Sequence, residues 1–193
     1  DEHTPLMQRF GRGLLVRGRK VARPGVQIDI NLERPKSLGT VRLRDANPVS
    51  HPAIDPNFLS SPQDIQELVT AVKEMRIVMQ QPQIAKYVTG EIGAWEGAQS
   101  DEEIVAAIRQ TAYTGHHPCS TSRMGHDNDS GAVLDSQLRV RGVHGLRVCD
   151  AAAMPGQITG NLYATVVAMA EKAADMIAGK PPLWGSEDVQ EAA

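Results

Sequence analysis

Residues 26–44 read VQIDINLERPKSLGTVRLR and contain two runs in which apolar and polar residues alternate, one over 26–32 and one over 40–44. Such alternation is typical of half-buried strands, because successive strand side chains point to opposite faces. Pro35 lies between the runs, and we expect them to pair as neighbouring antiparallel strands. Residues 45–60, with three prolines, predict a long ordered loop.

Two helices are predicted after this loop. Ser61 can cap the first, Pro62 suits its first turn, and Asp64 favours its positive end. Its apolar stripe at helical spacing predicts a core-facing side: Ile65, Leu68, Val69, Val72, Met75 and Met79. Residues 100–103 (SDEE) form a capping box for the second helix. The apolar residues expected to point inward there are Ile104, Val105 and Ile108.

The last third of the chain predicts a short buried strand and a long helix. Residues 145–149 (GLRVC) indicate the strand, and the helix is expected from Gly160 to about Ala178. One face of this helix is apolar, with Leu162, Val166, Met169, Ala170, Ala173 and Ile177. Strands and helices without regular β-α-β alternation favour the α+β class. No GxGxxG follows a strand, so we expect no dinucleotide-phosphate site within the chain.

Bulk properties exclude several classes of function. The 193 residues carry a net charge of −3, which argues against a nucleic-acid-binding protein. The basic cluster at 9–23 is interpreted as a loop and strand edge. Two cysteines without CxxC spacing favour a reducing compartment, and we expect a cytoplasmic protein. We find no transmembrane run and no signal peptide, and the absent initiator Met indicates a fragment of a longer protein.

Two segments concentrate polar and small residues beside apolar ones, namely 113–125 (YTGHHPCSTSRMG) and 146–176. Pro118 restricts His117 to an extended backbone, and imidazole accepts a proton near neutral pH. Asp150 follows the predicted strand, and Asn161 stands at the predicted helix start, where free N–H groups favour negative charge. A structural histidine at 117 and a plain N-cap at 161 are the competing interpretations.

Other functions fit the same residue types less well. A zinc site of a hydrolase would draw on His116, His117, Cys119, His126, Asp127 and Asp129, but their spacing matches no known finger. A Cys119–His117 nucleophile pair lacks an orienting third group. A non-enzymatic binding or assembly domain also remains an alternative. His126 and His144 lie in turn-like regions and are expected to face solvent, and Arg123 is expected to hold a loop by hydrogen bonds.

Three separated blocks resemble one family. They are HPCSTSRMG at 117–125, VLDSQLRVRGVHGLRVCDAAAMP at 133–155 and ITGNLYATVVAMAEKAADMI at 158–177. Together they resemble the closing signature of the glucose-methanol-choline (GMC) oxidoreductases, in the choline dehydrogenase-like branch. Residues 34–69 resemble the substrate-domain segment of the same family, so the resemblance extends in collinear order over roughly residues 25–180.

This resemblance implies an FAD-dependent oxidoreductase acting on a small-molecule alcohol. The family's catalytic His-Pro pair falls on His117 and Pro118, and this histidine takes the alcohol proton while hydride passes to flavin N5. The second active-site residue, which hydrogen-bonds the substrate oxygen, falls on Asn161. The cofactor-contacting positions implied by the resemblance are Pro118, Asp150, Ala151, Asn161, Leu162 and Tyr163. No metal is implied.

The resemblance also implies a domain division. Residues 1–140 would belong to the substrate domain, and 141–180 would supply a strand and a long helix that complete the FAD-binding domain. Beyond the resemblance, the proline-broken, polar composition of 181–193 predicts a tail. The N-terminal FAD-binding segment of the family is expected as a missing partner of this chain. Ser120 stands where glycine is common in the branch and Tyr163 where a second asparagine is common; these departures bear on the identity of the alcohol and not on the reaction class. The sequence indicates no particular electron acceptor.

Overall fold

The computed structural model describes residues 14–16, 19–21 and 25–181, which divide into two units, 1–31 and 32–193. In the first unit, β1 (Leu14–Val16) pairs antiparallel with β2 (Arg19–Val21). The basic cluster at 9–23 lies partly outside the described residues, as does nearly all of the predicted tail at 181–193. Everything that bears on the site lies in the second unit.

The strand pairing predicted for 26–32 is wrong, because residues 25–32 form no strand. Instead β3 (Thr40–Arg42) pairs antiparallel with β4 (Ala53–Asp55), inside the segment predicted to be loop. The reason is local turn chemistry: Asp45 accepts the Asn47 amide at 2.8 Å, and Asn47 accepts the Val49 amide at 3.1 Å. Asx turns of this kind fold the chain back on itself, so β3 pairs with β4, the strand that follows it in the sequence.

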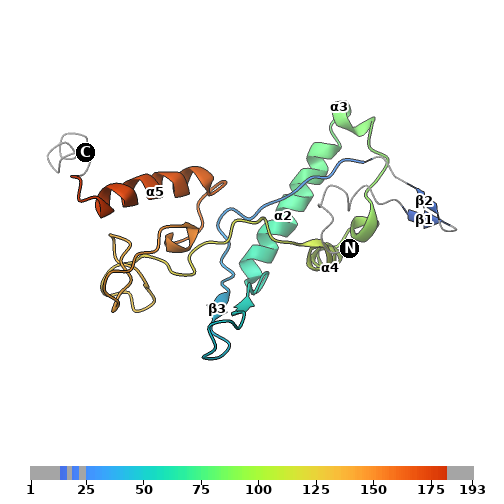
Figure 1. Cartoon of the computed structure of the whole chain (residues 1–193). Helices are drawn as coiled ribbons and strands as arrows, with labels where there is room; N and C mark the ends of the chain where they lie inside the picture. The colour runs from blue at the N-terminus through green and yellow to red at the C-terminus, as the bar shows by residue number, and fades with distance from the viewer. Residues whose placement is uncertain (1–13, 17–18, 22–24, 182–193) are drawn as a thin grey trace. The chain divides into compact units, whose positions relative to one another are not determined.

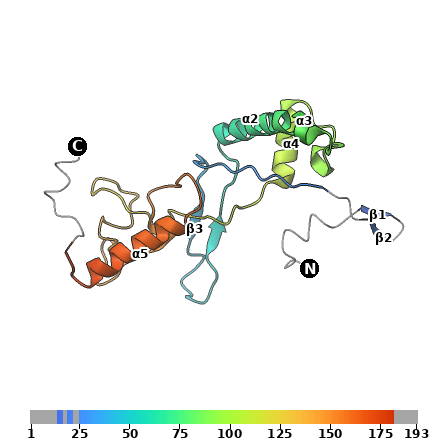
Figure 2. The same ribbon diagram turned by 90° about the horizontal axis from the view of Figure 1, so that it is seen from above.

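The predicted first helix is confirmed as α2 (Pro62–Met79) and the second as α4 (Asp101–Thr111). The two helices pack against each other with their axes crossing (Figures 1 and 2). Val69 and Val72 of the predicted stripe are buried, and the side chains buried on α4 are Ile104, Ala107 and Ile108. The capping box of α4 is present in both directions. Two short elements lie between them, α3 (Pro82–Ala85) and the 3-10 turn η1 (Gly93–Trp95).

The start of α2 differs from its prediction in one detail. Ser61 is the N-cap residue, but its hydroxyl caps no helix amide, and its own N–H donates to Ser37 Oγ at 3.0 Å. Asp64, 1% exposed, accepts hydrogen bonds from the Lys36 N–H, the Ser37 N–H and the Ser37 hydroxyl. This carboxylate therefore joins the segment after Pro35 to the first turn of the helix.

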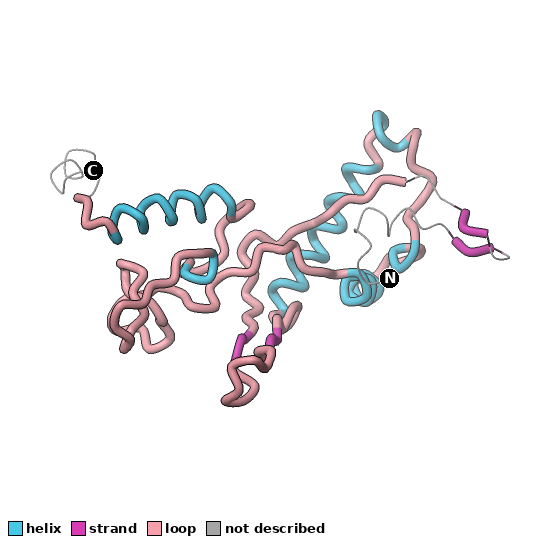
Figure 3. The backbone as a smooth tube through the Cα atoms, viewed as in Figure 1, coloured by secondary structure: helices cyan, strands magenta, loops and turns pink. Residues whose placement is uncertain are grey.

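The C-terminal part consists mostly of loops packed against one helix, α5 (Tyr163–Ile177), as Figure 3 shows. The buried cluster joins Ala173 of this helix to Leu134, Leu138 and Ala153. The predicted inward face of α5 is only partly right, since Leu162 is buried but Ile177 is 65% exposed. This packing brings the segments on either side of residue 150 against the helix.

Two further boundaries are corrected here. Residues 145–149 form only an isolated bridge, Arg139 to Arg147, because Gly142 and Gly145 adopt positive φ and interrupt an extended ladder. The helix begins at Tyr163 rather than at Gly160, whose φ of 111° is not helical. Helices with small antiparallel sheets agree with the α+β class. No helix in the described residues is both long and apolar enough to cross a membrane.

Candidate functional site

His117 and Pro118 lie exposed in the loop that follows α4. The loop is turned by two residues in the left-handed region, His116 with φ 62° and Ser120 with φ 69°. The Thr114 hydroxyl accepts the His116 N–H at 3.0 Å and supports the first of these turns. Left-handed backbone at non-glycine residues is costly and concentrates at functional sites. The loop thus presents the imidazole of His117 on the surface of this chain.

The segment after His117 runs beside the 3-10 turn η2 (Ala151–Ala153). Three backbone bonds join them: Ser120, Ser122 and Met124 donate to the carbonyls of Ala151, Ala152 and Ala153 at 3.1, 3.0 and 2.9 Å. Asp150 caps η2 by accepting the Ala152 N–H at 2.7 Å. The structure therefore places the His-Pro loop next to Asp150 and Ala151, which are about thirty positions away in the sequence.

A side-chain bond extends this contact toward Asn161. The Cys119 thiol donates to Gln157 Oε1 at 3.1 Å. Cys119 lies two residues after His117, and Gln157 lies four residues before Asn161. Asn161 is exposed, Leu162 is buried at the N-cap of α5, and Tyr163, the first helical residue, is 80% exposed. Within residues 25–181 no hydrogen bond joins the side chains of His117 and Asn161 directly, so the contacts bring their segments together rather than the two groups themselves.

Arg123 holds the turn at 126–131, as predicted. Its guanidinium bonds both carboxylate oxygens of Asp129, and the Gly131 N–H donates to the same carboxylate at 2.9 Å. The hydrogen bonds from Arg123, and then from the Gly131 amide, lower the pKa of Asp129 to about 2. The guanidinium of this arginine is therefore engaged in the loop.

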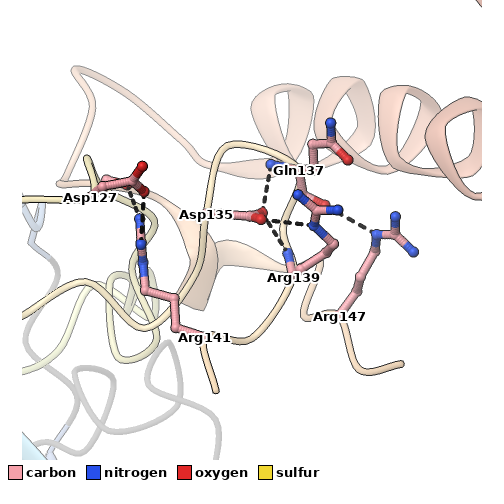
Figure 4. Close-up of polar contacts among 7 residues, drawn as sticks. Asp127, Asp135, Gln137, Arg139, Arg141 and Arg147 are labelled. Atoms are coloured by element: carbon pink, nitrogen blue, oxygen red, sulfur yellow. Dashed lines mark hydrogen bonds and ion pairs between the residues drawn. The ribbon is translucent and has the colours of Figure 1, made fainter. Parts of the chain in front are cut away.

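A second polar network shapes residues 127–147 (Figure 4). Arg139 pairs with Asp135 at 2.7 Å, and Asp135 also accepts the backbone amides of Gln137 and Arg139. Arg141 bonds Asp127 at 2.9 Å and the Gly125 carbonyl at 2.8 Å, while Arg147 donates to the Gln137 carbonyl at 3.1 Å. These bonds order the turns that lead to Asp150.

The metal alternative finds no support in this arrangement. Among the described residues no three His, Cys, Asp or Glu side chains are grouped to hold an ion. The acids that the alternative required bond arginines instead, Asp129 to Arg123 and Asp127 to Arg141, and the thiol of Cys119 bonds Gln157.

Exposed residues at the predicted cofactor positions fit part of a flavin by their chemistry. Asp150 offers a carboxylate, Asn161 an amide and Tyr163 a phenol, and all three are exposed. A Cβ added at Gly156 or Gly160 would meet nothing within 4 Å, so the backbone is uncovered at these two positions. Flavin and ribityl groups require hydrogen-bond donors and acceptors of this kind, and helix N-termini favour anionic groups.

Three side chains that contact this region were not predicted from the sequence. Besides Gln157, they are Arg34, whose Nε donates to Thr159 Oγ1 at 3.3 Å, and Glu33, whose carboxylate accepts the Gly160 N–H. Gln157 lies between the family-like blocks 133–155 and 158–177, and this position was the one sequence signal that could have placed it near the site. No local pattern indicates the other two, because their partners lie more than a hundred residues away.

Known proteins resemble this chain over most of its length. The mitochondrial choline dehydrogenase of Homo sapiens is 42% identical over 161 residues, which cover 83% of this chain and 27% of that protein. The oxygen-dependent choline dehydrogenase of Klebsiella pneumoniae subsp. pneumoniae is 45% identical over 159 residues, 82% of this chain and 28% of that protein. The chain thus spans about a quarter of the length of these curated relatives.

Solved structures agree with this result. An FAD-dependent oxidoreductase from Chaetomium thermophilum superposes with a TM-score of 0.67 at 34% identity, covering 72% of this chain and 24% of that chain. A formate oxidase from Aspergillus oryzae RIB40 gives a TM-score of 0.69 at 31% identity, covering 77% of this chain and 26% of that one. Residues 35–170 match the family described as GMC oxidoreductase, whose members are FAD-dependent flavoproteins. This chain belongs to the GMC oxidoreductase family and corresponds to its C-terminal domain.

Proposed function

We propose that this chain is the catalytic C-terminal portion of an FAD-dependent oxidoreductase that converts an alcohol to an aldehyde or ketone. The observation that carries the proposal is the joining of the His-Pro loop to η2 and to Gln157, because it links the first family-like block to the second and to the residue directly before the third. Membership of the GMC family supplies the reaction class. The relatives named as choline dehydrogenases make a small alcohol such as choline the first substrate to test.

Each residue has a distinct role in this proposal. His117 removes the proton from the alcohol oxygen, and the side-chain amide of Asn161 donates a hydrogen bond to that oxygen and orients it. FAD, when bound, accepts the hydride from the alcohol carbon. Developing negative charge near Asn161 is stabilised by the N-terminal amides of α5, which begin two residues later.

The cofactor contacts of this proposal follow the same region. Asp150 and Ala151 would hold the ribityl and phosphate part of FAD, and Pro118, Asn161, Leu162 and Tyr163 would contact its flavin. Leu162 contributes its backbone, because its side chain is buried at 4% exposure. Residues 141–180 then complete an FAD-binding domain, residues 1–140 belong to the substrate domain, and the N-terminal FAD-binding portion of the protein supplies the remaining contacts.

The test is a comparison of two histidine variants in the full-length protein. His117→Ala is expected to slow anaerobic reduction of bound FAD by choline about 10²–10⁴-fold while FAD content is unchanged, since general-base help has this magnitude. His126→Ala is the matched control, because His126 is also exposed but lies in the turn held by Arg123. Flavin reduction at the wild-type rate in His117→Ala would overturn the assignment of the base.

A further inference from the structure

Residues 157–160, directly before Asn161, are held by side chains from two distant parts of the chain. The Cys119 thiol bonds Gln157 from the His-Pro loop. Arg34 Nε bonds Thr159 Oγ1 at 3.3 Å, and the carboxylate of Glu33 accepts the N–H of Gly160. Glu33 and Arg34 are sequence neighbours, as are Thr159 and Gly160, so the two bonds form a double link between these segments.

This segment depends on such links for its conformation. Residues 157–161 belong to no helix or strand, and α5 begins only at Tyr163. Gly160 has a φ of 111°, a conformation that glycine adopts readily and that no regular element enforces. A backbone this free would let the Asn161 side chain occupy many orientations, each of which costs entropy to exclude. We therefore expect hydrogen bonds from residues outside 157–161 to select one orientation of the Asn161 side chain.

We propose that Glu33 is a positioning residue, whose carboxylate holds the Gly160 amide and thereby orients Asn161, while the Cys119–Gln157 bond keeps this segment registered with the loop of His117. The inference rests on the function proposed above. In this proposal Glu33 acts only through the backbone amide that it binds, and not by contact with substrate or flavin. A carboxylate acceptor is suited to this, because charge-assisted hydrogen bonds are stronger than neutral ones.

The first measurement is independent of catalysis. In the full-length FAD-loaded protein, hydrogen exchange of the peptide spanning residues 157–163 reports the Gly160 amide. Glu33→Ala is expected to speed its exchange about tenfold, because loss of one charge-assisted bond costs roughly that factor. Glu33→Gln retains an acceptor oxygen and is expected to restore most of the protection. Glu74→Ala, on the exposed side of α2, is the matched control and should leave this exchange unchanged.

The second measurement is the split between kcat and KM with choline as the probe. Glu33→Ala is expected to lower kcat about ten- to a hundredfold with little change in KM, since misplacing a group near the reacting atoms has this effect. Glu33→Gln should recover most of kcat. A purely structural role would instead lower FAD content and thermal stability and leave kcat per bound FAD unchanged, which would overturn the proposal.

A second pair of variants covers the case in which Glu33→Ala does not fold. Cys119→Ser keeps a donor toward Gln157 and is expected to retain kcat, whereas Cys119→Ala loses it and should lower kcat. Equal kcat in these two variants would contradict the registration of the two segments. His117→Ala distinguishes failure of the proposed function from failure of the positioning role. If FAD is reduced at the normal rate in His117→Ala, the proposed function fails. If His117→Ala loses activity but Glu33→Ala leaves amide exchange or kcat unchanged, only the positioning role of Glu33 is refuted.

Discussion

Asp64 provides the sharpest test of what holds the second unit together. Its side chain is 1% exposed and is the one buried charged side chain of the described residues. The carboxylate accepts the Lys36 N–H at 2.8 Å, the Ser37 N–H at 2.8 Å and the Ser37 hydroxyl at 2.5 Å. Asp64→Ala removes the acceptor of all three donors at once and leaves two backbone amides of a partly buried segment unpaired.

The expected loss in the free energy of unfolding is about 3 kcal/mol, since stranding the buried partners of a charged group costs a few kcal/mol and water recovers part of it. Urea unfolding followed by circular dichroism measures it as a shift in midpoint at constant slope. Glu67→Ala is the matched control on the same helix. Glu67 is exposed and, among the residues that the structure describes, accepts a bond from Gln63 alone, so the loss in Glu67→Ala should stay within about 0.5 kcal/mol.

The same contribution depends on pH with a defined sign. Burial raises the pKa of Asp64, but the hydrogen bonds from the Ser37 hydroxyl and from the Lys36 and Ser37 amides outweigh it, and the pKa lies below its ordinary value. The unfolded chain binds this proton more readily, at a pKa of about 3.9. The stabilisation is therefore full at neutral pH and is lost as pH falls below about 4 and through the folded pKa. A loss below 0.5 kcal/mol in Asp64→Ala, or one that stays constant from about pH 7 to pH 3, would refute this reasoning.

Two further predictions concern the loop of His117 and the turn that follows it. Ser120→Gly should stabilise the protein by about 0.5–1 kcal/mol, because Ser120 holds a φ of 69° that glycine adopts without strain. Ser122→Gly is the control and should destabilise the protein, because Ser122 lies outside the left-handed region. A lower thermal midpoint in Ser120→Gly than in the wild type would contradict this prediction. The difference in unfolding free energy between the wild type and Asp129→Asn should shrink as pH falls from about 4 toward 2, because the pKa of Asp129 is lowered to about 2 in the folded protein. Urea midpoints of both proteins at about pH 7 and about pH 2.5 measure this difference, and an equal difference at the two pH values would contradict the prediction.

Local sequence patterns determined the helices and much of the site's composition. The stripe of α2 and the capping box of α4 involve residues three or four positions apart, so their geometry follows from the helix itself. The three family-like blocks likewise identified the GMC family, because the residue types and their order are written directly in the chain.

Pairings over longer distances were decided only in the tertiary structure. Alternation predicted strands at 26–32 and 40–44, but a period of two marks a strand without naming its partner, and the Asx turns at 45–50 paired β3 with β4 instead. The burial of Asp64 and the link from Glu33 to Gly160 also lie outside any local rule. A hydrogen bond between residues 127 positions apart depends on where the whole chain packs, which no window of the sequence contains.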